Sequence, residues 1–226
     1  IENLLFVALT DFGPDLEGVL TAYPGIDIPD TLPMALKDIR QCYIAETEKY
    51  AHVTYFFNGG YAHPVAGEDW IVIPSKDVNS YAEDPAMSTV ELTKRVIKDL
   101  KVDKYDFVLA NFAAPDMVGH TGNLEAGIKA VELVDKSVGQ IIKATLAKQG
   151  TVIITADHGN VEEMINLKTR EIDTEHSINP VPFIIVNHHD FKLRANGKLA
   201  NIAPTILDIL NIKKPKLISE KSLIIK

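Results

Sequence analysis

Cysteine is almost absent from this sequence of 226 residues, in which Cys42 is the single example. One cysteine cannot form a disulfide within the chain, so the fold must depend on a packed core rather than on covalent cross-links. The 46% hydrophobic content is sufficient for such a core in a chain of this length. The composition is compatible with a reducing compartment, and we expect a cytoplasmic protein.

Long hydrophobic runs are missing as well. No stretch of about 20 apolar residues is available to cross a bilayer, and no secretory signal opens the sequence, so we expect no membrane partner. An initiating methionine is also lacking. The chain begins at Ile1 and enters an apolar run at residues 4–9 almost at once, which leads us to expect that another segment precedes it.

Positive charge is in short supply. Lysine and arginine number 23 against 31 acidic residues, which gives a net charge of -8, and no basic stripe is present. A nucleic-acid partner is therefore not expected. An anionic substrate would have to be attracted by a local feature, such as a bound metal ion.

The segments that are present alternate between short apolar runs and helical patterns. Strands are predicted at residues 4–9, 52–57, 107–112, 151–156 and 183–186. Helices are predicted at residues 34–42, from Ser88 to about Leu100, from about Leu124 towards Gly150, and from Asn201 to Leu210, with a loop from Asp11 to about Pro33. This alternation indicates an α/β fold with a mostly parallel sheet covered by helices on both faces. In such sheets, functional residues gather beyond the carboxyl ends of the strands.

Local patterns predict the ends and faces of the helices. Ser88 and Glu91 have the spacing of a capping box. Asn201 is a candidate N-cap, and Gly150 is a candidate C-terminal stop for the long helix. The apolar stripe of that helix is predicted to consist of Ile128, Val131, Val134, Val138, Ile141 and Ile142.

Three polar clusters contain candidate metal ligands. Asp116 and His120 are four residues apart shortly after the 107–112 strand, so a helical turn would place them on one face. Asp157 and His158 come at the end of the next strand, and His176 precedes the last one. Each cluster alone has an ordinary interpretation, as a surface pair, a turn or a lone histidine. Their common position near the ends of buried strands favours convergence on a two-metal site.

The residue types narrow the choice of ion. Imidazole with carboxylate suits Mn²⁺, Zn²⁺, Co²⁺ or Fe²⁺, whereas Mg²⁺ prefers oxygen ligands. Two such ions suit phosphoryl transfer, to which Lys49 would add a positive charge. The mixed charges of residues 46–49 also suit a solvated lysine, and the spacing alone favours that interpretation. The other histidines are interpreted as structural: His52, His63, His188 and His189.

Longer blocks of sequence carry a family resemblance. Residues 45–54 and 57–60, residues 111–122 and residues 155–162 resemble signatures of the cofactor-independent (2,3-bisphosphoglycerate-independent) phosphoglycerate mutases. Two further blocks extend the match, residues 179–182 and residues 199–205. The order and spacing of these blocks hold from about Ile44 to the C-terminus.

The resemblance implies an alkaline-phosphatase-like α/β domain of an enzyme that interconverts 3-phosphoglycerate and 2-phosphoglycerate in glycolysis and gluconeogenesis. In this family a serine takes the phosphoryl group and returns it to the other hydroxyl. Two Mn²⁺ ions serve the site, with Mg²⁺, Co²⁺ or Zn²⁺ as alternatives. By matching motif, Asp116, His120 and His176 resemble the ligands of one ion. Asp157 and His158 resemble ligands of the other ion, which also binds the serine.

Lys49 resembles the lysine that contacts the substrate phosphoryl group, where it would neutralise charge in the transition state. The family's serine and one further metal-binding aspartate have no counterpart in this sequence. We therefore interpret residues 1–24 as the tail of an inserted transferase domain with a linker. Residues 25–226 would be the C-terminal part of the phosphatase-like domain, incomplete at its N-terminal side. Trp70 and Cys42 depart from the usual residue types without touching the metal motifs.

These inferences predict a chain that does not isomerise phosphoglycerate by itself and that works with the missing N-terminal half of the same enzyme. They also predict a sheet that lacks a strand and exposes an edge. The family suggests a monomer. Two other interpretations stay open: a phosphatase or sulfatase of the same superfamily, and a non-catalytic metal-binding lobe that acts with another chain. Activity on a generic phosphate ester but not on phosphoglycerate would favour the first. Mn²⁺ binding without turnover, even after the missing half is supplied in trans, would favour the second.

Overall fold

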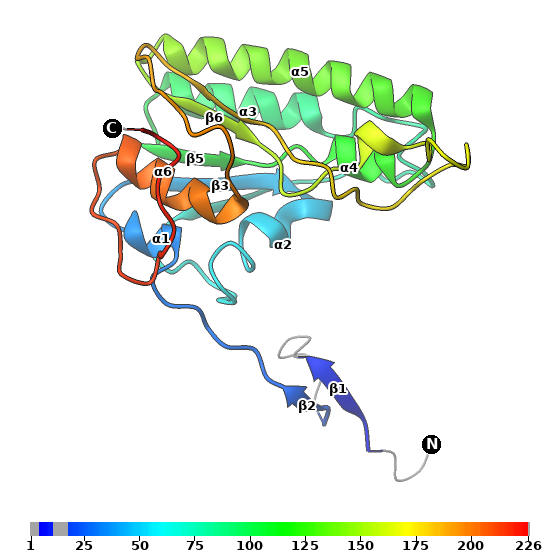
Figure 1. Cartoon of the computed structure of the whole chain (residues 1–226), viewed down its shortest axis with the longest axis horizontal. Coiled ribbons are helices and arrows are strands. Elements are labelled where there is room, and N and C mark those ends of the chain that lie inside the picture. Colours follow the sequence, from blue (N-terminus) through cyan, green and yellow to red (C-terminus); the bar gives the residue numbers. More distant parts are fainter. Residues whose placement is uncertain (1–4, 11–17, 226) are drawn as a thin grey trace.

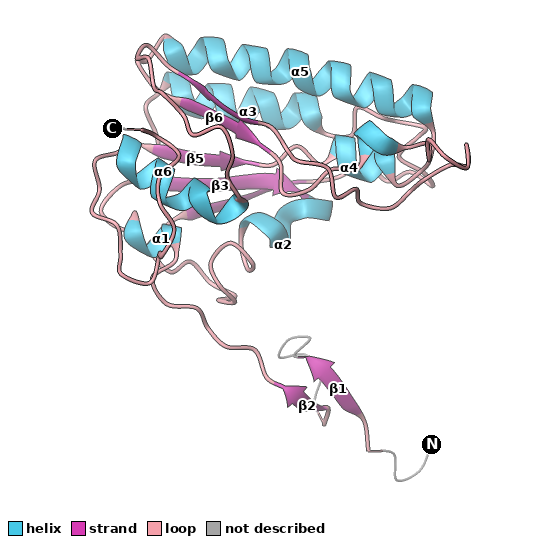
Figure 2. Ribbon diagram, in the orientation of Figure 1, coloured by secondary structure: helices cyan, strands magenta, loops and turns pink. Residues whose placement is uncertain are grey.

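The computed structural model describes residues 5–10 and 18–225, which form short strands covered by helices (Figure 1; Figure 2). The strands are β1 (Val7–Thr10), β2 (Leu20–Tyr23), β3 (Gln41–Glu46), β4 (Asp69–Ile73), β5 (Phe107–Ala110), β6 (Val152–Thr155) and β7 (Phe183–Val186). The α-helices are α1 (Leu32–Ala35), α2 (Tyr50–Val53), α3 (Thr89–Lys101), α4 (Ala114–Gly119), α5 (Leu124–Leu146) and α6 (Ile202–Ile209). Short 3-10 turns are η1 (Thr47–Lys49), η2 (Val161–Glu163) and η3 (Leu199–Asn201).

The central sheet has the order β4-β3-β5, and both of its pairings are parallel. β3 lies in the middle and is buried along its whole length. Its alternate side chains point to opposite faces, so Ile44 packs with Leu92 of α3, whereas Tyr43 packs with Val53 of α2. Figure 1 shows α3 and α5 on one side of the sheet and α1, α2 and α6 on the other. Helices therefore cover both faces, as predicted.

The remaining strands form two separate pairs. β6 and β7 are antiparallel, with Thr155 opposite Phe183, and β1 and β2 are parallel. Among the described residues, three of the four strand pairings are parallel, which confirms the predicted mostly parallel α/β fold. β5, β6 and β7 confirm the strands predicted at residues 107–112, 151–156 and 183–186.

β1 and β2 lie apart from the rest of the chain (Figure 1). The strand predicted at residues 4–9 is observed from Val7, and residue 4 lies outside the described residues. β2 falls within the segment predicted to be a loop, so that prediction was wrong there, because the Asp, Gly and Pro residues on both sides of β2 indicated a loop. Leu9 and Tyr23 of this pair are 75% and 74% exposed. The division of the chain after residue 24 stays a prediction.

The helix predicted at residues 34–42 was wrong from residue 36 onward. α1 ends at Ala35, and the chain enters β3 at Gln41. A short apolar segment without a clear period suits either structure, and tertiary burial decides between them. Here β3 gains a neighbouring strand on each edge and a helical layer on each face, which an isolated helix at this position would not.

The strand predicted at residues 52–57 was also wrong. This segment begins within the helix α2 and continues as turns. The strand that pairs with β3 on the side opposite β5 is instead the unpredicted β4. The helical spacing is what packs the segment against the sheet, because Val53 and Phe57, four residues apart, both reach Tyr43. Its β-branched and aromatic residues had suggested a strand through their propensity, which tertiary packing overrides.

The helices α3 and α6 confirm the predicted helical segments, but their N-terminal contacts differ from the predicted ones. The Ser88 hydroxyl precedes α3 and donates to Pro74 O at 2.7 Å, so the expected capping box does not form. Asn201 precedes α6, and its Oδ1 accepts from Lys198 N at 2.8 Å instead of from α6. In both cases the polar side chain forms a hydrogen bond with a neighbouring segment instead of with the helix that follows it.

The long helix α5 confirms the predicted stripe only in part: Val134 and Ile141 are partly buried against the core, but the fully buried face lies elsewhere. Its buried residues are small: Ala126, Gly127, Ala130 and Ser137. Ile128 and Val131 of the predicted stripe are 51% and 43% exposed. The helix also ends at Leu146, before Gly150, and Gln149 adopts the left-handed conformation with a φ of 59°. Neither α5 nor any other helix in the described part of the chain is long and apolar enough to span a membrane.

Candidate metal centre

Three segments that carry candidate ligands, called the ligand-bearing segments, meet at one end of the strands, where β5 and β6 finish and β7 starts. Asp116 lies on α4, which follows β5, and His120 comes directly after α4. Asp157 and His158 follow β6, whereas His176 precedes β7. Because β6 and β7 are antiparallel, the last residue of β6 and the first residue of β7 lie at the same end of the pair. The structure thus brings the three polar clusters of the sequence together.

Asp116, His120 and His176 form the tightest part of this site. Their donor atoms all lie within 4.8 Å of one another. Asp116 Oδ1 is 3.2 Å from His120 Nε2 and 3.1 Å from His176 Nε2, and the two Nε2 atoms are 3.1 Å apart. One carboxylate oxygen and two imidazole nitrogens therefore point at a common centre.

The hydrogen bonds of this cluster turn lone pairs towards its centre, as a cation site requires. His120 Nδ1 lies 2.7 Å from Thr174 O, and a carbonyl oxygen can only accept, so Nδ1 carries a proton. In the neutral ring, His120 Nε2 is then an acceptor, and it faces Asp116 Oδ1. Acceptors held this close need a positive charge between them, either a proton or a metal ion. A ring held by a carbonyl is also the usual arrangement of a metal-binding histidine, so these residues fit a divalent cation.

Asp157 and His158 lie beside this cluster. The His158 ring stacks on the His176 ring with centroids 3.7 Å apart and an interplanar angle of 22°. His158 Nδ1 is 4.0 Å from Asp116 Oδ1, and His158 Nε2 is 3.5 Å from Asp157 Oδ2. The Asp157 side chain is 59% exposed, which leaves its carboxylate open on one side. This pair can serve a second cation next to the first.

Lys49 contacts the same carboxylate from η1, directly after β3. Its Nζ lies 2.5 Å from Asp116 Oδ2, and the two side chains are 13% and 14% exposed. Burial raises the pKa of Asp116, but the hydrogen bonds from Lys49 and Asn160 and the charges of Lys49 and His120 outweigh it, so the pKa lies below its usual value. The interpretation of Lys49 as a solvated lysine, which spacing alone favoured, was therefore wrong.

Sequence reasoning missed the polar residues that hold these segments together. Asn160 donates to Asp116 Oδ1 at 2.8 Å, and Glu162 accepts from Ser177 Oγ and from Asn179 Nδ2. Burial raises the pKa of Glu162, but its hydrogen bonds, that from Ser177 foremost, bring it below the usual value. The available signal was the position of Asn160 and Glu162 within the 155–162 block, next to the candidate ligands.

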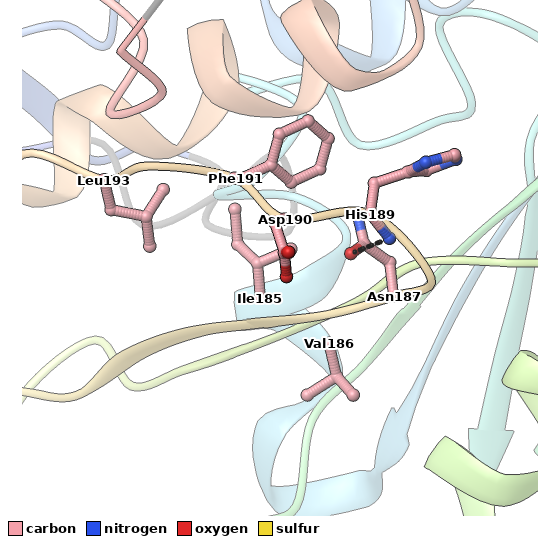
Figure 3. Close-up of a pocket in the computed structure, with 7 residues that line it drawn as sticks. All are labelled: Ile185, Val186, Asn187, His189, Asp190, Phe191 and Leu193. Atoms are coloured by element: carbon pink, nitrogen blue, oxygen red, sulfur yellow. Dashed lines mark hydrogen bonds between the residues drawn. The ribbon is translucent and has the colours of Figure 1, made fainter.

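Other histidines lie at the far end of the β6-β7 pair. His188 Nε2 is 2.9 Å from Leu146 O, and His189 lines a pocket of about 240 Å³ with Asp190 and Phe191 (Figure 3). This pocket follows β7, so it lies at the opposite end of the pair from the ligand-bearing segments. Within residues 5–10 and 18–225, no group of three histidine, cysteine or carboxylate side chains is as close as the cluster around Asp116.

Comparison with known proteins identifies relatives of this chain. Residues 24–214 match the family described as the Metalloenzyme superfamily. A 2,3-bisphosphoglycerate-independent phosphoglycerate mutase of Clostridium botulinum (strain Langeland) is 48% identical over 224 residues, which cover 98% of this chain and 44% of the relative. A similar mutase of Methanosarcina barkeri is 48% identical over 226 residues, covering 99% of this chain and 43% of the relative. The chain thus spans less than half of these relatives.

Solved structures agree with the sequence comparison. A crystal structure of Leishmania mexicana phosphoglycerate mutase, determined at low cobalt concentration, superposes with a TM-score of 0.77 at 33% identity. The superposition covers 83% of this chain and 37% of the Leishmania chain. These matches confirm the resemblance to the mutases and the alkaline-phosphatase-like fold that it implied. The chain belongs to the metalloenzyme superfamily.

Proposed function

We propose that this chain is the metal-binding part of a phosphoglycerate mutase, an isomerase that interconverts 3-phosphoglycerate and 2-phosphoglycerate. The observation that carries the proposal is the convergence of Asp116, His120, His176, His158 and Lys49 at one edge of the strands. The 48% identity to two such mutases over almost the whole chain supports the same substrate. The enzyme would act in glycolysis and gluconeogenesis, as a cytoplasmic monomer.

The ligands divide into two sets. Asp116, His120 and His176 would hold one divalent ion, because their donor atoms already face a common centre. Asp157 and His158 would hold the other, with further ligands from outside this chain. We propose Mn²⁺ for both sites because mixed imidazole and carboxylate ligands suit it, with Co²⁺, Zn²⁺ and Mg²⁺ as alternatives.

When bound, the ions would supply positive charge for the attacking oxygen and for the phosphoryl group. The residues of this chain contribute orientation and a fixed charge. His120 is held by Thr174 O so that its Nε2 faces the centre. Lys49, buried beside Asp116, would donate to phosphoryl oxygens and neutralise the charge that develops in the transition state.

The rest of the longer protein would complete both the sheet and the site. In the described part of the chain, β5 pairs only with β3, and β6 only with β7. β5 is half-buried and β6 is half-buried or exposed, whereas the central β3 is fully buried. A strand between β5 and β6 would cover these edges. We propose that this strand arrives with the serine nucleophile and a further aspartate from an N-terminal half, and that residues 1–24 belong to an inserted domain and its linker.

The test uses the 226-residue chain with Mn²⁺ and 3-phosphoglycerate, and formation of 2-phosphoglycerate is followed by ³¹P NMR. We expect no turnover by the chain alone. We expect turnover when the complementary N-terminal part of the Clostridium botulinum mutase is added, and none when His176→Ala replaces the wild-type chain in that mixture. A generic phosphate ester serves as a second substrate.

The outcomes separate the three interpretations. Hydrolysis of the generic ester without isomerisation of 3-phosphoglycerate would support a phosphatase and contradict the mutase. Mn²⁺ binding with no turnover in the reconstituted mixture would support a metal-binding lobe without catalysis, provided that the two parts co-elute on a sizing column. Sustained isomerisation by the chain alone would show that the nucleophile lies within it.

A further inference from the structure

One buried asparagine joins two of the ligand-bearing segments. Asn160 lies two residues after His158, yet its side chain reaches Asp116 on α4. Its Nδ2 donates to Asp116 Oδ1 at 2.8 Å and lies 3.3 Å from Asp116 O. Oδ1 is the oxygen that faces His120 and His176, so the amide holds the side of the carboxylate that is turned towards the cluster.

The chemistry of the contact dictates how the amide is oriented. A flipped Asn160 would place its Oδ1 against the Asp116 carboxylate, an arrangement of acceptors without a proton. In the observed orientation, Asn160 is 4% exposed and its Oδ1 has no hydrogen-bond partner among the described residues. An unpaired buried acceptor is unfavourable for folding. The benefit of this side chain therefore lies in its bond to Asp116.

A glycine on α4 makes room for the amide. Gly119 has no positive φ, so its backbone conformation does not require glycine. A Cβ at this position would lie 2.8 Å from Asn160 Cγ and closer still to Asn160 Oδ1. Any side chain at position 119 would thus displace the amide from Asp116. Position 119 therefore requires glycine because a larger residue would leave no room for the Asn160 side chain.

The backbone around Asn160 is tied to the third ligand-bearing segment. Glu162 accepts from Asn160 N at 2.7 Å, and its other carboxylate oxygen accepts from Ser177 Oγ. Ser177 directly follows His176, and its N donates to Gly159 O at 3.0 Å. The segment after β6 is therefore bonded to both of the other ligand-bearing segments.

We propose that Asn160 is a positioning residue that fixes Asp116 relative to the segment carrying His158, so that the metal ligands are aligned before an ion binds. This inference rests on the proposed function, because it needs a divalent ion at Asp116. Hydrogen-bond partners of ligating side chains change metal affinity by about 10- to 100-fold when they are removed. We expect a loss of that size for Asn160→Ala.

The experiment measures Mn²⁺ affinity of the 226-residue chain by electron paramagnetic resonance, well below the unfolding transition. The variants are Asn160→Ala, Gly119→Ala and the double variant. His176→Ala tests the proposed function itself, because it removes a ligand. Circular dichroism and thermal unfolding in chelator establish that each variant is folded.

Asn201→Ala is the matched control. Asn201 is also a buried asparagine, 8% exposed, and its amide bonds to Lys198 N at 2.8 Å and Lys221 O at 2.9 Å. It lies before α6, and its side chain bonds to Lys198, Glu220 and Lys221, which belong to none of the ligand-bearing segments. Its loss is expected to lower the unfolding temperature and to leave the Mn²⁺ affinity within about twofold of wild type.

The expected result is a Mn²⁺ affinity at least about tenfold weaker for Asn160→Ala and for Gly119→Ala, relative to Asn201→Ala. The double variant should bind as Asn160→Ala does, because without the amide an alanine at position 119 has nothing to displace. If Asn160→Ala does not fold, Gly119→Ala decides the question, since it retains the asparagine.

Two different failures are distinguishable. If wild type and His176→Ala bind Mn²⁺ equally, the proposed metal centre is wrong, and the positioning role falls with it. If His176→Ala weakens binding but folded Asn160→Ala and Gly119→Ala bind like Asn201→Ala, the metal centre stands and the positioning role of Asn160 is refuted.

Discussion

Replacement of Lys49 by methionine separates two effects of the ion pair at the candidate metal centre. Lys49 and Asp116 are nearly buried, with 13% and 14% of their side chains exposed and 2.5 Å between Nζ and Oδ2. Methionine keeps the apolar stem but removes the charge, so Asp116 loses its compensating cation. Removing one partner of a buried ion pair costs about 3–5 kcal/mol. Asp116 retains the bond from Asn160, so we expect a loss of about 1–3 kcal/mol in the unfolding free energy.

The same substitution should strengthen metal binding. The Lys49 ammonium competes with a divalent ion for Asp116 Oδ2 and repels it, so the uncompensated carboxylate of Lys49→Met gains more from a bound cation. A coupling of about 1–3 kcal/mol corresponds to a Mn²⁺ affinity about 5- to 150-fold tighter than that of wild type. In the reconstituted enzyme, the variant should nevertheless lose turnover, because the charge on the phosphoryl oxygens is no longer neutralised.

Urea unfolding in chelator and Mn²⁺ titration of the same samples measure both quantities. Lys148→Met is the control: Lys148 pairs with Asp103 at 2.7 Å, but both side chains are exposed, at 40% and 67%. Such a surface pair contributes less than about 1 kcal/mol and should leave Mn²⁺ affinity unchanged. An apo stability of Lys49→Met equal to that of Lys148→Met, together with unchanged or weaker Mn²⁺ binding, would refute this account of the pair.

Two further predictions concern a partly exposed ion pair and the links between the ligand-bearing segments. The Arg40 side chain, and then its backbone amide, hold the pKa of Asp106 at about 2, below its usual 3.8; the stability that the pair adds is therefore present above about pH 4 and lost as the pH falls through 2. Since both side chains are partly exposed, Asp106→Asn should lower the unfolding free energy by at most about 1 kcal/mol at pH 7, and in urea titrations the difference from wild type should vanish as the pH falls below 2. Gly159→Ala should weaken Mn²⁺ binding, because the new Cβ would overlap Glu162 and Ser177 and separate the ligand-bearing segments; equal affinities in a parallel titration would count against that link.

The candidate ligands are the part of the protein that short-range sequence patterns predict best. Asp116 and His120 were expected on one face of a helical turn, and their contact at 3.2 Å follows directly from the i, i+4 spacing. Asp157 and His158 are adjacent in sequence and stay adjacent at the end of β6. Their spacing in the sequence brings the two members of each pair together whatever the surrounding fold. The structure therefore confirms each pair without changing it.

The apolar segments were less predictable. Residues 34–42 and 52–57 are short, apolar and without a strong period, and both were assigned the wrong structure in whole or in part. Their conformation depends on which faces become covered, and the covering elements come from distant parts of the chain. The exposed positions of Ile128 and Val131 in α5 have the same origin: the helix turns its small residues to its neighbours, although the large ones gave the stronger pattern.

The α/β class, the family resemblance and the candidate metal ligands could be read from the amino-acid order alone, because strand and helix alternation and ligand spacing are local properties. How those residues meet depends on the tertiary fold. The antiparallel course of β7 returns His176 to the edge where Asp157 and His158 leave β6, and packing buries Lys49 against Asp116. Such contacts join residues far apart in sequence, and their geometry depends on the direction in which each strand enters the fold, which no local pattern encodes.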